Sequence, residues 1–239
     1  MHPKLFDSFD AAVADIPDGA TIMVPGFSQV GSPHNLIAAM YRQGAKDLTL
    51  IANSAGALEG VVTMSNLIDD RRVRKVVFAF TAGTHPSRPV TLQKLEAAGE
   101  IEAELVPQGT LAERIRAGGA GIPAFYTPTS VGTVLAKGKE HREFRGRTYV
   151  MEEAITADYA FIRARKADEF GNLQFHQSAR NFNPIMAMAA TCTIVEAEEV
   201  VPVGELDPDF VHTSGVYVHR IVQIPPDGVW HLEPRLGGA

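Results

Sequence analysis

Short apolar segments alternate with amphipathic segments through the first half of this chain, and that alternation restricts the possible folds most strongly. Apolar runs too short for a buried helix, set between helix-like segments, are typical of strands that are buried on both faces. The pattern predicts strands over 21–24, 48–52, 75–80 and 101–106, and helices over 7–16, 34–43, 61–69 and 90–98. Units of this kind build an open, mainly parallel, twisted α/β sheet with helices on both faces.

The alternation loosens after about residue 120, where additional strands are expected in the C-terminal half. The pattern predicts strands over 149–152, 159–164, 194–198 and 216–222, and a helix over 182–190. Neither a repeat nor a linker divides the sequence, and 239 residues suit one large domain. We therefore expect residues 1–239 to form a single domain whose core needs no disulfide or metal.

The charge balance argues against nucleic acid as a partner. The chain has 28 acidic residues and 22 Lys and Arg, a formal net charge of -6, whereas proteins that bind phosphate backbones usually carry a basic excess. The densest basic run, residues 71–75, precedes an apolar segment. We interpret it as the solvated end of a helix before a buried strand, with a small anionic ligand left open as the alternative.

Cysteine usage and hydropathy bear on where the chain acts. The single cysteine, Cys192, cannot close a disulfide within the chain, and its apolar surroundings favour burial over a nucleophilic role. The N-terminus lacks the apolar core of a signal peptide. No apolar run is long enough to span a membrane. These features lead us to expect a cytoplasmic protein without a membrane segment.

Three loops follow predicted strands, at the sheet edge where open α/β sheets bind ligands. The first contains Gly26, Phe27, Ser28 and Gly31, just before a predicted helix. Glycines let a backbone approach a ligand closely, and the N–H groups at a helix start attract negative charge. The spacing matches neither the G-x-G-x-x-G nucleotide motif nor a P-loop, so an ordinary tight turn fits equally well.

The second and third loops carry amide and hydroxyl side chains. Asn53 and Ser54 follow the second strand, where a turn stabilised by an Asn side chain is an equally good interpretation. Gln108 and Gly109 follow the fourth strand and begin a short amphipathic helix. A glycine-rich exit at residues 118–121 ends that helix, and we leave open whether it faces a partner chain or a ligand.

These loops can bind, but no evident nucleophile accompanies them. Glu113 and Arg116 are spaced to pair on one helix face. The adjacent Glu152 and Glu153 favour capping or ion pairing over catalysis. The eight histidines show no metal-ligand spacing, and no G-x-S-x-G motif is present. The residues therefore disfavour a metal and show no evident nucleophile on this chain.

The loops and several further motifs resemble the A subunit of the family I CoA-transferases, especially the succinyl-CoA:3-ketoacid type. The similarity extends from about Phe6 to Val222, and its most specific stretches are residues 107–129, 152–156, 178–183 and 217–220. The A subunit of the related 3-oxoadipate CoA-transferase shares residues 180–182 and 184–190. The 3-oxoadipate type is therefore an alternative to the succinyl-CoA:3-ketoacid type as the model for the substrate class.

The resemblance implies one of two chains of an enzyme that moves CoA from an acyl-CoA to a carboxylic acid, such as a 3-oxo acid, by ping-pong transfer. In that family the acyl-CoA is attacked by a glutamate of the B subunit, which becomes a glutamyl-CoA thioester. The Ser-Glu-x-Gly motif of that glutamate does not occur here. The implied partner is the B subunit, in an A2B2 heterotetramer. No cofactor is implied, because the coenzyme A thioester is a substrate.

The same resemblance implies that this chain forms one wall of the acyl-acid pocket. The first loop of the family would match residues 25–33, its Asn-Asn-Ala-Gly segment residues 53–56, and its pocket glutamine Gln108. Backbone N–H groups near residues 26–31 and the amides of Asn53 and Gln108 would then hold a substrate carboxylate or carbonyl. Such groups orient reactants that are already charged at neutral pH.

Four residues depart from the family pattern. Pro25 replaces a glycine and removes a backbone donor, Ser28 and Ser130 replace glycines, and Ser54 replaces an asparagine. We expect these changes to alter the preference for the acyl acid. Two alternatives stay open, an acyl-CoA hydrolase on the same scaffold and a non-catalytic acyl-CoA binding module.

Overall fold

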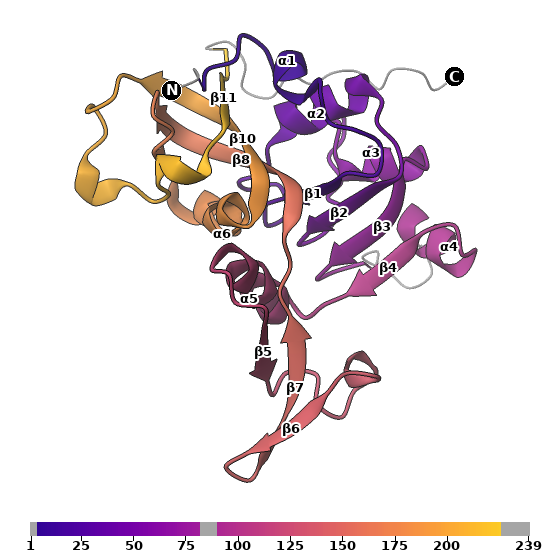
Figure 1. Ribbon diagram of the computed structural model, residues 1–239. Coiled ribbons are helices and arrows are strands. Elements are labelled where there is room, and N and C mark those ends of the chain that lie inside the picture. The colour runs from indigo at the N-terminus through magenta and orange to yellow at the C-terminus, as the bar shows by residue number, and fades with distance from the viewer. Residues whose placement is uncertain (1–3, 82–89, 226–239) are drawn as a thin grey trace.

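A mainly parallel sheet forms the centre of the molecule (Figure 1). The computed structural model describes residues 4–81 and 90–225, so the first residues of the N-terminal stretch considered above lie outside it. The strands of this sheet are β1 (Thr21–Val24), β2 (Leu48–Ala52), β3 (Val73–Phe78), β4 (Glu102–Leu105), β8 (Ala157–Asp168), β9 (Leu173–Gln174), β10 (Ala190–Val201) and β11 (Arg220–Gln223).

The sheet has the order β11-β10-β8-β1-β2-β3-β4, and each neighbouring pair in that path is parallel. The short β9 adds an antiparallel pairing to β8. The predicted open, mainly parallel α/β sheet is therefore confirmed. Because β1 lies between β2 and β8, the strand order reverses there, and the loop after β1 leaves the sheet at a position that commonly binds ligands.

Helices cover both faces of the sheet, as the sequence predicts. They are α1 (Phe9–Val13), α2 (His34–Gln43), α3 (Met64–Asp69), α4 (Thr91–Ala97), α5 (Gln108–Gly119) and α6 (Asn183–Met188). Successive side chains of a strand point to opposite faces. Ile22 and Val24 of β1 accordingly pack with α1–α4 in one buried cluster, while Met23 packs with α5 and α6 in another.

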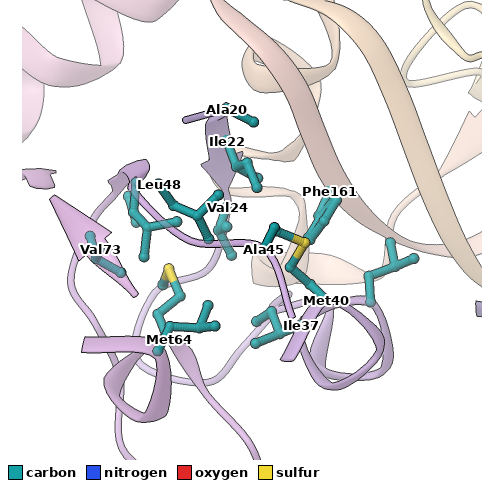
Figure 2. Packing of buried hydrophobic residues seen from close by; sticks show 14 of the residues in the cluster. Ala20, Ile22, Val24, Ile37, Met40, Ala45, Leu48, Met64, Val73 and Phe161 are labelled. Carbon is teal, nitrogen blue, oxygen red and sulfur yellow. The ribbon is translucent and has the colours of Figure 1, made fainter. Parts of the chain in front are cut away.

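Figure 2 shows the first of these clusters, in which Ile22, Val24 and Leu48 of the strands meet Met40 of α2 and Met64 of α3. The strands β1 and β2 and the helix α2 have the bounds that the sequence predicts. Gly44 ends α2 in the left-handed conformation, at a φ of 97°, which glycine adopts without steric cost. Apolar runs bounded by such residues are therefore enough to locate these elements.

A second, three-stranded antiparallel sheet extends away from the main sheet (Figure 1). It consists of β5 (Ala124–Thr127), β6 (His141–Phe144) and β7 (Arg147–Glu153) in the order β5-β7-β6. Only a strand over 149–152 is predicted here from the sequence. All four residues of β6 are exposed, so no apolar run marks it, and its hairpin is closed by Arg145 and Gly146, both at positive φ.

The predicted strand over 216–222 is wrong in its first half. The chain makes a 3₁₀ turn, η4 (Gly215–Tyr217), before β11 begins at Arg220. Gly215 lies against Phe170, where an added Cβ would be 2.5 Å from the carbonyl oxygen of Phe170. The Ser214 hydroxyl also accepts a hydrogen bond from the Val216 N–H. These contacts favour a turn over an extended strand.

The basic run at residues 71–75 is not simply a solvated helix end. Arg72 is buried and donates to the carbonyls of Met40, Tyr41 and Ala45, at 3.1, 2.6 and 2.9 Å. It thereby satisfies carbonyls that the last turn of α2 leaves open. Lys75 pairs with Glu102 at 2.6 Å. Within the described ranges, no helix has the length and apolar character needed to cross a membrane.

Candidate functional site

The loops that follow β1 and β2 come together and line one pocket. Gly26 and Ser28 of the first loop face Ser54 and Gly56 of the second across it. Gln29 joins the two loops, because its Nε2 donates to the carbonyl of Ala57 at 3.2 Å. The pocket encloses about 10 Å³, roughly the space of one water molecule. This pocket is too small for an acyl group. A second, more open pocket of about 270 Å³ adjoins the same loop and is lined by Gln29, Val30, Gly31, Arg163 and Glu198.

The first loop is a tight hairpin. Phe27 and Val30 exchange two backbone hydrogen bonds of 3.1 Å, and their side chains are 55% and 48% exposed. Gly26 and Gly31 flank the hairpin at φ values of 125° and 77°. A Cβ on Gly26 would overlap the Ser32 hydroxyl. The glycine spacing is thus required by backbone geometry and close packing in this loop.

Part of the predicted anion-binding capacity of this loop is already used. The Gly26 N–H donates to Asn181 Oδ1 at 3.1 Å, and the N–H groups of Phe27 and Val30 donate to each other's carbonyls. Among residues 26–31, only the N–H groups of Ser28, Gln29 and Gly31 make no hydrogen bond to another described residue. Of these three residues, Ser28 and Gln29 line the pocket, whereas Gly31 is buried.

The start of α2 already has a buried carboxyl group of this chain beside it, which uses donors that a ligand would otherwise find there. Glu196 of β10 is fully buried, and its carboxylate accepts the Leu36 N–H at 3.0 Å and the Asn35 amide at 3.4 Å. Arg163 of β8 donates to the same carboxylate at 2.9 Å. Burial raises the pKa of Glu196 to about 7, while Arg163 opposes the rise.

His34 lies in the first turn of α2 and also lines the pocket. Its side chain is buried, and burial together with the positive charge of Arg163 lowers its pKa to about 4. His34 is therefore neutral at pH 7 and adds no positive charge to the pocket.

The second and third loops meet through a hydrogen bond between predicted site residues. Gln108 Nε2 donates to Asn53 Oδ1 at 2.6 Å. Asn53 is buried, and its backbone carbonyl accepts the N–H groups of Ala79 and Phe80. Asn53 Nδ2 and Gln108 Oε1 make no hydrogen bond to another described residue. One amide nitrogen and one amide oxygen thus stay available next to Ser54, although Asn53, Gln108 and Gly109 do not themselves line the pocket.

The four departures from the family pattern separate in space. Pro25, Ser28 and Ser54 line the pocket. Ser130 does not line it and follows β5 in the antiparallel sheet, so its expected effect on a substrate is not supported by its position. Ser28 and Ser130 have φ values of 56° and 77°, a region that glycine adopts most readily.

Two asparagines that support the first loop carry no predicted role. Asn181 contacts the backbone of Gly26 and Val30, and Asn183 contacts that of Gly31. Both belong to residues 178–183, a motif that this chain shares with the CoA-transferase A subunits but to which the sequence assigned no role. Their distance in sequence from the first loop, more than 150 residues, leaves no local signal that pairs them with it.

The remaining candidate groups have structural roles. Glu152 is buried and accepts a hydrogen bond from Lys139 at 2.6 Å, and Glu113 pairs with Arg116 at 2.7 Å. The predicted ion pairs are thus present. Cys192 is half-buried, and burial raises the pKa of its thiol, which disfavours a nucleophilic thiolate. In the described ranges, no cluster of three His, Cys, Asp or Glu suits a metal ion.

The glycine-rich exit of α5 is partly explained by packing inside the molecule. A Cβ on Gly118 would overlap the carbonyl of Ile155, and one on Gly119 would be 2.9 Å from the Cβ of Met188. Both glycines therefore allow α5 to lie close to its neighbours. Gly121 has no heavy atom within 4 Å of an added Cβ.

Comparison with known proteins matches this chain along nearly its whole length. A family model described as Coenzyme A transferase matches residues 6–223. The A subunit of the probable succinyl-CoA:3-ketoacid coenzyme A transferase of Bacillus subtilis is 48% identical over 219 residues, which cover 92% of this chain and 89% of that protein. The A subunit of the 3-oxoadipate CoA-transferase of Pseudomonas putida is 48% identical over 224 residues, covering 94% and 95%.

A solved structure also shares the fold. The acyl-CoA transferase YdiF from Escherichia coli O157:H7 superposes with a TM-score of 0.77 at 24% sequence identity. The match covers 99% of this chain and 49% of that one. The fold of this chain thus corresponds to about half of that polypeptide.

Proposed function

Because the chain belongs to the coenzyme A transferase family and is of its A-subunit type, we propose that it acts with a B-type partner chain to transfer coenzyme A. In this proposal the two-chain enzyme moves CoA from an acyl-CoA donor to a 3-oxo carboxylic acid. Residues 1–239 act as one domain, in an A2B2 assembly in the cytoplasm.

The observation that carries the proposal is a pocket wall without a nucleophilic carboxylate. Among the described residues that line the pocket, none is an Asp, a Glu or a Cys. The wall instead offers backbone N–H groups at Ser28 and Gln29 and the nearby Asn53 amide. Glu198 lines a neighbouring pocket on the same loop, but Arg163 pairs with its carboxylate at 2.9 Å. We therefore assign the carboxylate that attacks the acyl-CoA to the partner chain, and a fold that corresponds to half of a larger transferase is compatible with this.

The transfer balances without any further reagent. The partner's glutamate attacks the acyl-CoA carbonyl, the C–S bond breaks, and CoA leaves as a thiolate. The thiolate then attacks the glutamyl carbonyl of the mixed anhydride, which releases the first acid and leaves a glutamyl-CoA thioester. An acceptor carboxylate attacks this thioester, and the same steps in reverse order give the new acyl-CoA and the free glutamate.

The contribution of this chain is orientation and exclusion of water. Thiolate and carboxylates carry their charge at neutral pH, so no general base is needed for either attack. The N–H groups of Ser28 and Gln29 are suited to the acid's carboxylate or to the oxyanion that forms at the attacked carbonyl. Closing the pocket against the partner would protect the anhydride and the thioester from hydrolysis.

The substrate class follows from what the two relatives have in common. One is named for a 3-ketoacid and the other for 3-oxoadipate, and both of these are 3-oxo carboxylic acids. In this chain Ser28, Ser54 and Pro25 line the pocket. We expect these residues to shift the preference among 3-oxo acids, in chain length and in the number of carboxylates.

Co-expression with a chain that carries a Ser-Glu-x-Gly motif tests the proposal. The purified complex should transfer CoA from succinyl-CoA to acetoacetate or 3-oxoadipate, measured by chromatography of the CoA thioesters. Release of free CoA without an acceptor would indicate the hydrolase alternative instead, and failure to form a complex or to turn over would favour a binding module. An acceptor profile identical to that of a standard 3-ketoacid transferase would contradict the expected shift in preference.

A paired variant tests the amides at the site. Gln108→Glu replaces the donor to Asn53 with a carboxylate, which repels an anionic acid. We expect KM for the acceptor acid to rise about tenfold or more, a cost of about 1.4 kcal/mol in binding, with the complex intact. Gln223→Glu, an exposed site on β11, is the control and should leave KM unchanged. Equal KM values for both variants would remove Gln108 from the site.

A further inference from the structure

We propose that Asn181 and Asn183 are positioning residues, which hold the first loop in the conformation that aims its free N–H groups into the pocket. The inference rests on the proposed function for its link to catalysis, because that function makes the loop a wall of the acyl-acid site. The holding contacts themselves are a property of this chain alone.

Asn181 ties the two ends of the loop hairpin together through one amide. Its Oδ1 accepts the Gly26 N–H at 3.1 Å, and its Nδ2 donates to the Val30 carbonyl at 2.9 Å. The same amide is fixed on its own segment, where Oδ1 accepts the Phe182 N–H at 2.7 Å and Nδ2 donates to the Ser178 carbonyl at 3.0 Å. Both donors and the acceptor oxygen are used, so the amide has one orientation.

Asn183 adds a second, fully buried attachment. Its Nδ2 donates to the Gly31 carbonyl at 3.0 Å and to the Ala179 carbonyl at 2.9 Å. Its Oδ1 accepts the backbone N–H of Arg163 in β8 at 2.9 Å. The end of the first loop is thereby connected to the neighbouring strand of the main sheet, which is a rigid support.

The loop and the asparagine segment lie in direct backbone contact at Gly31. An added Cβ there would be 2.5 Å from the Ala179 carbonyl oxygen and 2.7 Å from Asn181 Nδ2. No side chain fits between the two segments at this point. The position of residues 178–183 therefore sets the position of the loop, and with it the position of Ser28 and Gln29, which line the pocket.

A purely structural role predicts the same loss of stability but no specific effect on the loop or on substrate. Asn172 is a matched control, because its Nδ2 donates to Asp168 at 2.8 Å and its Oδ1 accepts the Gly215 N–H at 2.9 Å. Asn172 lies in the turn between β8 and β9 and its partner Gly215 lies in η4, and neither of these two contacts involves the first loop. Asn172→Ala thus removes a comparable amide without touching the pocket wall.

The experiment compares wild type, Asn181→Ala, Asn181→Asp and Asn172→Ala in the co-purified two-chain enzyme. Hydrogen exchange of the backbone amides across residues 26–31 measures the loop, and kcat/KM for the acceptor acid measures its consequence. Asn181→Ala should speed exchange in this stretch about tenfold or more, because an opened amide loses its protection. It should lower kcat/KM about 100-fold, as expected when a reacting group is misplaced by about 1 Å.

Asn181→Asp keeps the acceptor for the Gly26 and Phe182 N–H groups and loses both donations, to the Val30 and Ser178 carbonyls. Its effects should therefore lie between those of Asn181→Ala and wild type. Asn172→Ala should match wild type in both measurements. Wild-type exchange and kcat/KM in Asn181→Ala, or equal effects of Asn181→Ala and Asn172→Ala, would overturn the inference. If exchange responds as expected but wild type transfers no CoA, the contacts stand and the proposed function fails.

Discussion

Replacing Gly31 with alanine is a direct perturbation of the way the first loop is seated. Gly31 has a φ of 77°, which costs an L-residue about 1–2 kcal/mol. The new methyl group would also lie 2.5 Å from the Ala179 carbonyl oxygen. A backbone oxygen cannot rotate away, so the segments must separate, at a cost of about 1–3 kcal/mol for overpacking.

The two effects together predict that Gly31→Ala lowers the free energy of unfolding by about 2–5 kcal/mol. Gly19, at the other end of β1, is a matched control, because its φ is 80° and an added Cβ meets no heavy atom within 4 Å. Gly19→Ala should therefore lose only the conformational part, about 1–2 kcal/mol.

Urea-induced unfolding of the two variants and wild type measures both losses, and the transfer assay measures the consequence for the site. We expect Gly31→Ala to lower kcat/KM for the acceptor acid about 100-fold, because the loop must move off residues 179–181. Gly19→Ala should retain wild-type kcat/KM. Equal stabilities and equal kinetics for the two alanine variants would refute the close seating of the loop.

Three further predictions concern stability. Glu152→Ala removes the buried partner of a lysine and should cost about 2 kcal/mol, whereas Glu153→Ala, an exposed neighbour, should stay within about 0.5 kcal/mol of wild type in urea unfolding. Arg72→Met removes three hydrogen bonds to carbonyls at and just beyond the end of α2, of which only that of Met40 keeps another donor, the Gly44 N–H, and it should cost about 3 kcal/mol. Arg74→Met at an exposed site should cost little. Between its unfolded pKa of 6.5 and its folded pKa of about 4, His34 is protonated only in the unfolded chain. The contribution of His34 to stability should therefore fall by about 2 kcal/mol as pH drops from 7 to 5. The raised pKa of Glu196 acts in the opposite direction over this range, so the test is the difference: wild type should lose about 2 kcal/mol more stability than His34→Gln. A pH dependence identical in wild type and His34→Gln would contradict the low pKa.

The central sheet could be predicted from the sequence because its signals are local. A short apolar run between turn residues locates β1 and β2, and the glycine after α2 marks the end of that helix. The antiparallel sheet escaped prediction because β6 is exposed along its whole length and contributes no apolar run. The Arg145-Gly146 pair, which has positive φ in the structure, indicates a hairpin turn but does not by itself predict the strands on either side.

The candidate site could be predicted in part for the same reason. Asn53 and Gln108 follow strands whose C-terminal ends share one edge of the sheet, and the structure joins their amides at 2.6 Å. Glu196 accepts a hydrogen bond from α2, and Asn181 accepts one from the first loop. Both residues lie far along the chain from the elements that they contact. Their roles depend on strand order, since β10 and the residues before α6 reach the loop only because β8 lies beside β1.

The central claim is that this chain shapes the pocket while its partner carries the covalent intermediate. The most direct test incubates the two-chain enzyme with succinyl-CoA in the absence of an acceptor, quenches it in acid and records the intact mass of each chain. The account predicts a partner chain heavier by one CoA less one water, and this chain at the mass of its sequence. A CoA adduct on this chain, or turnover with no adduct on either chain, would contradict it.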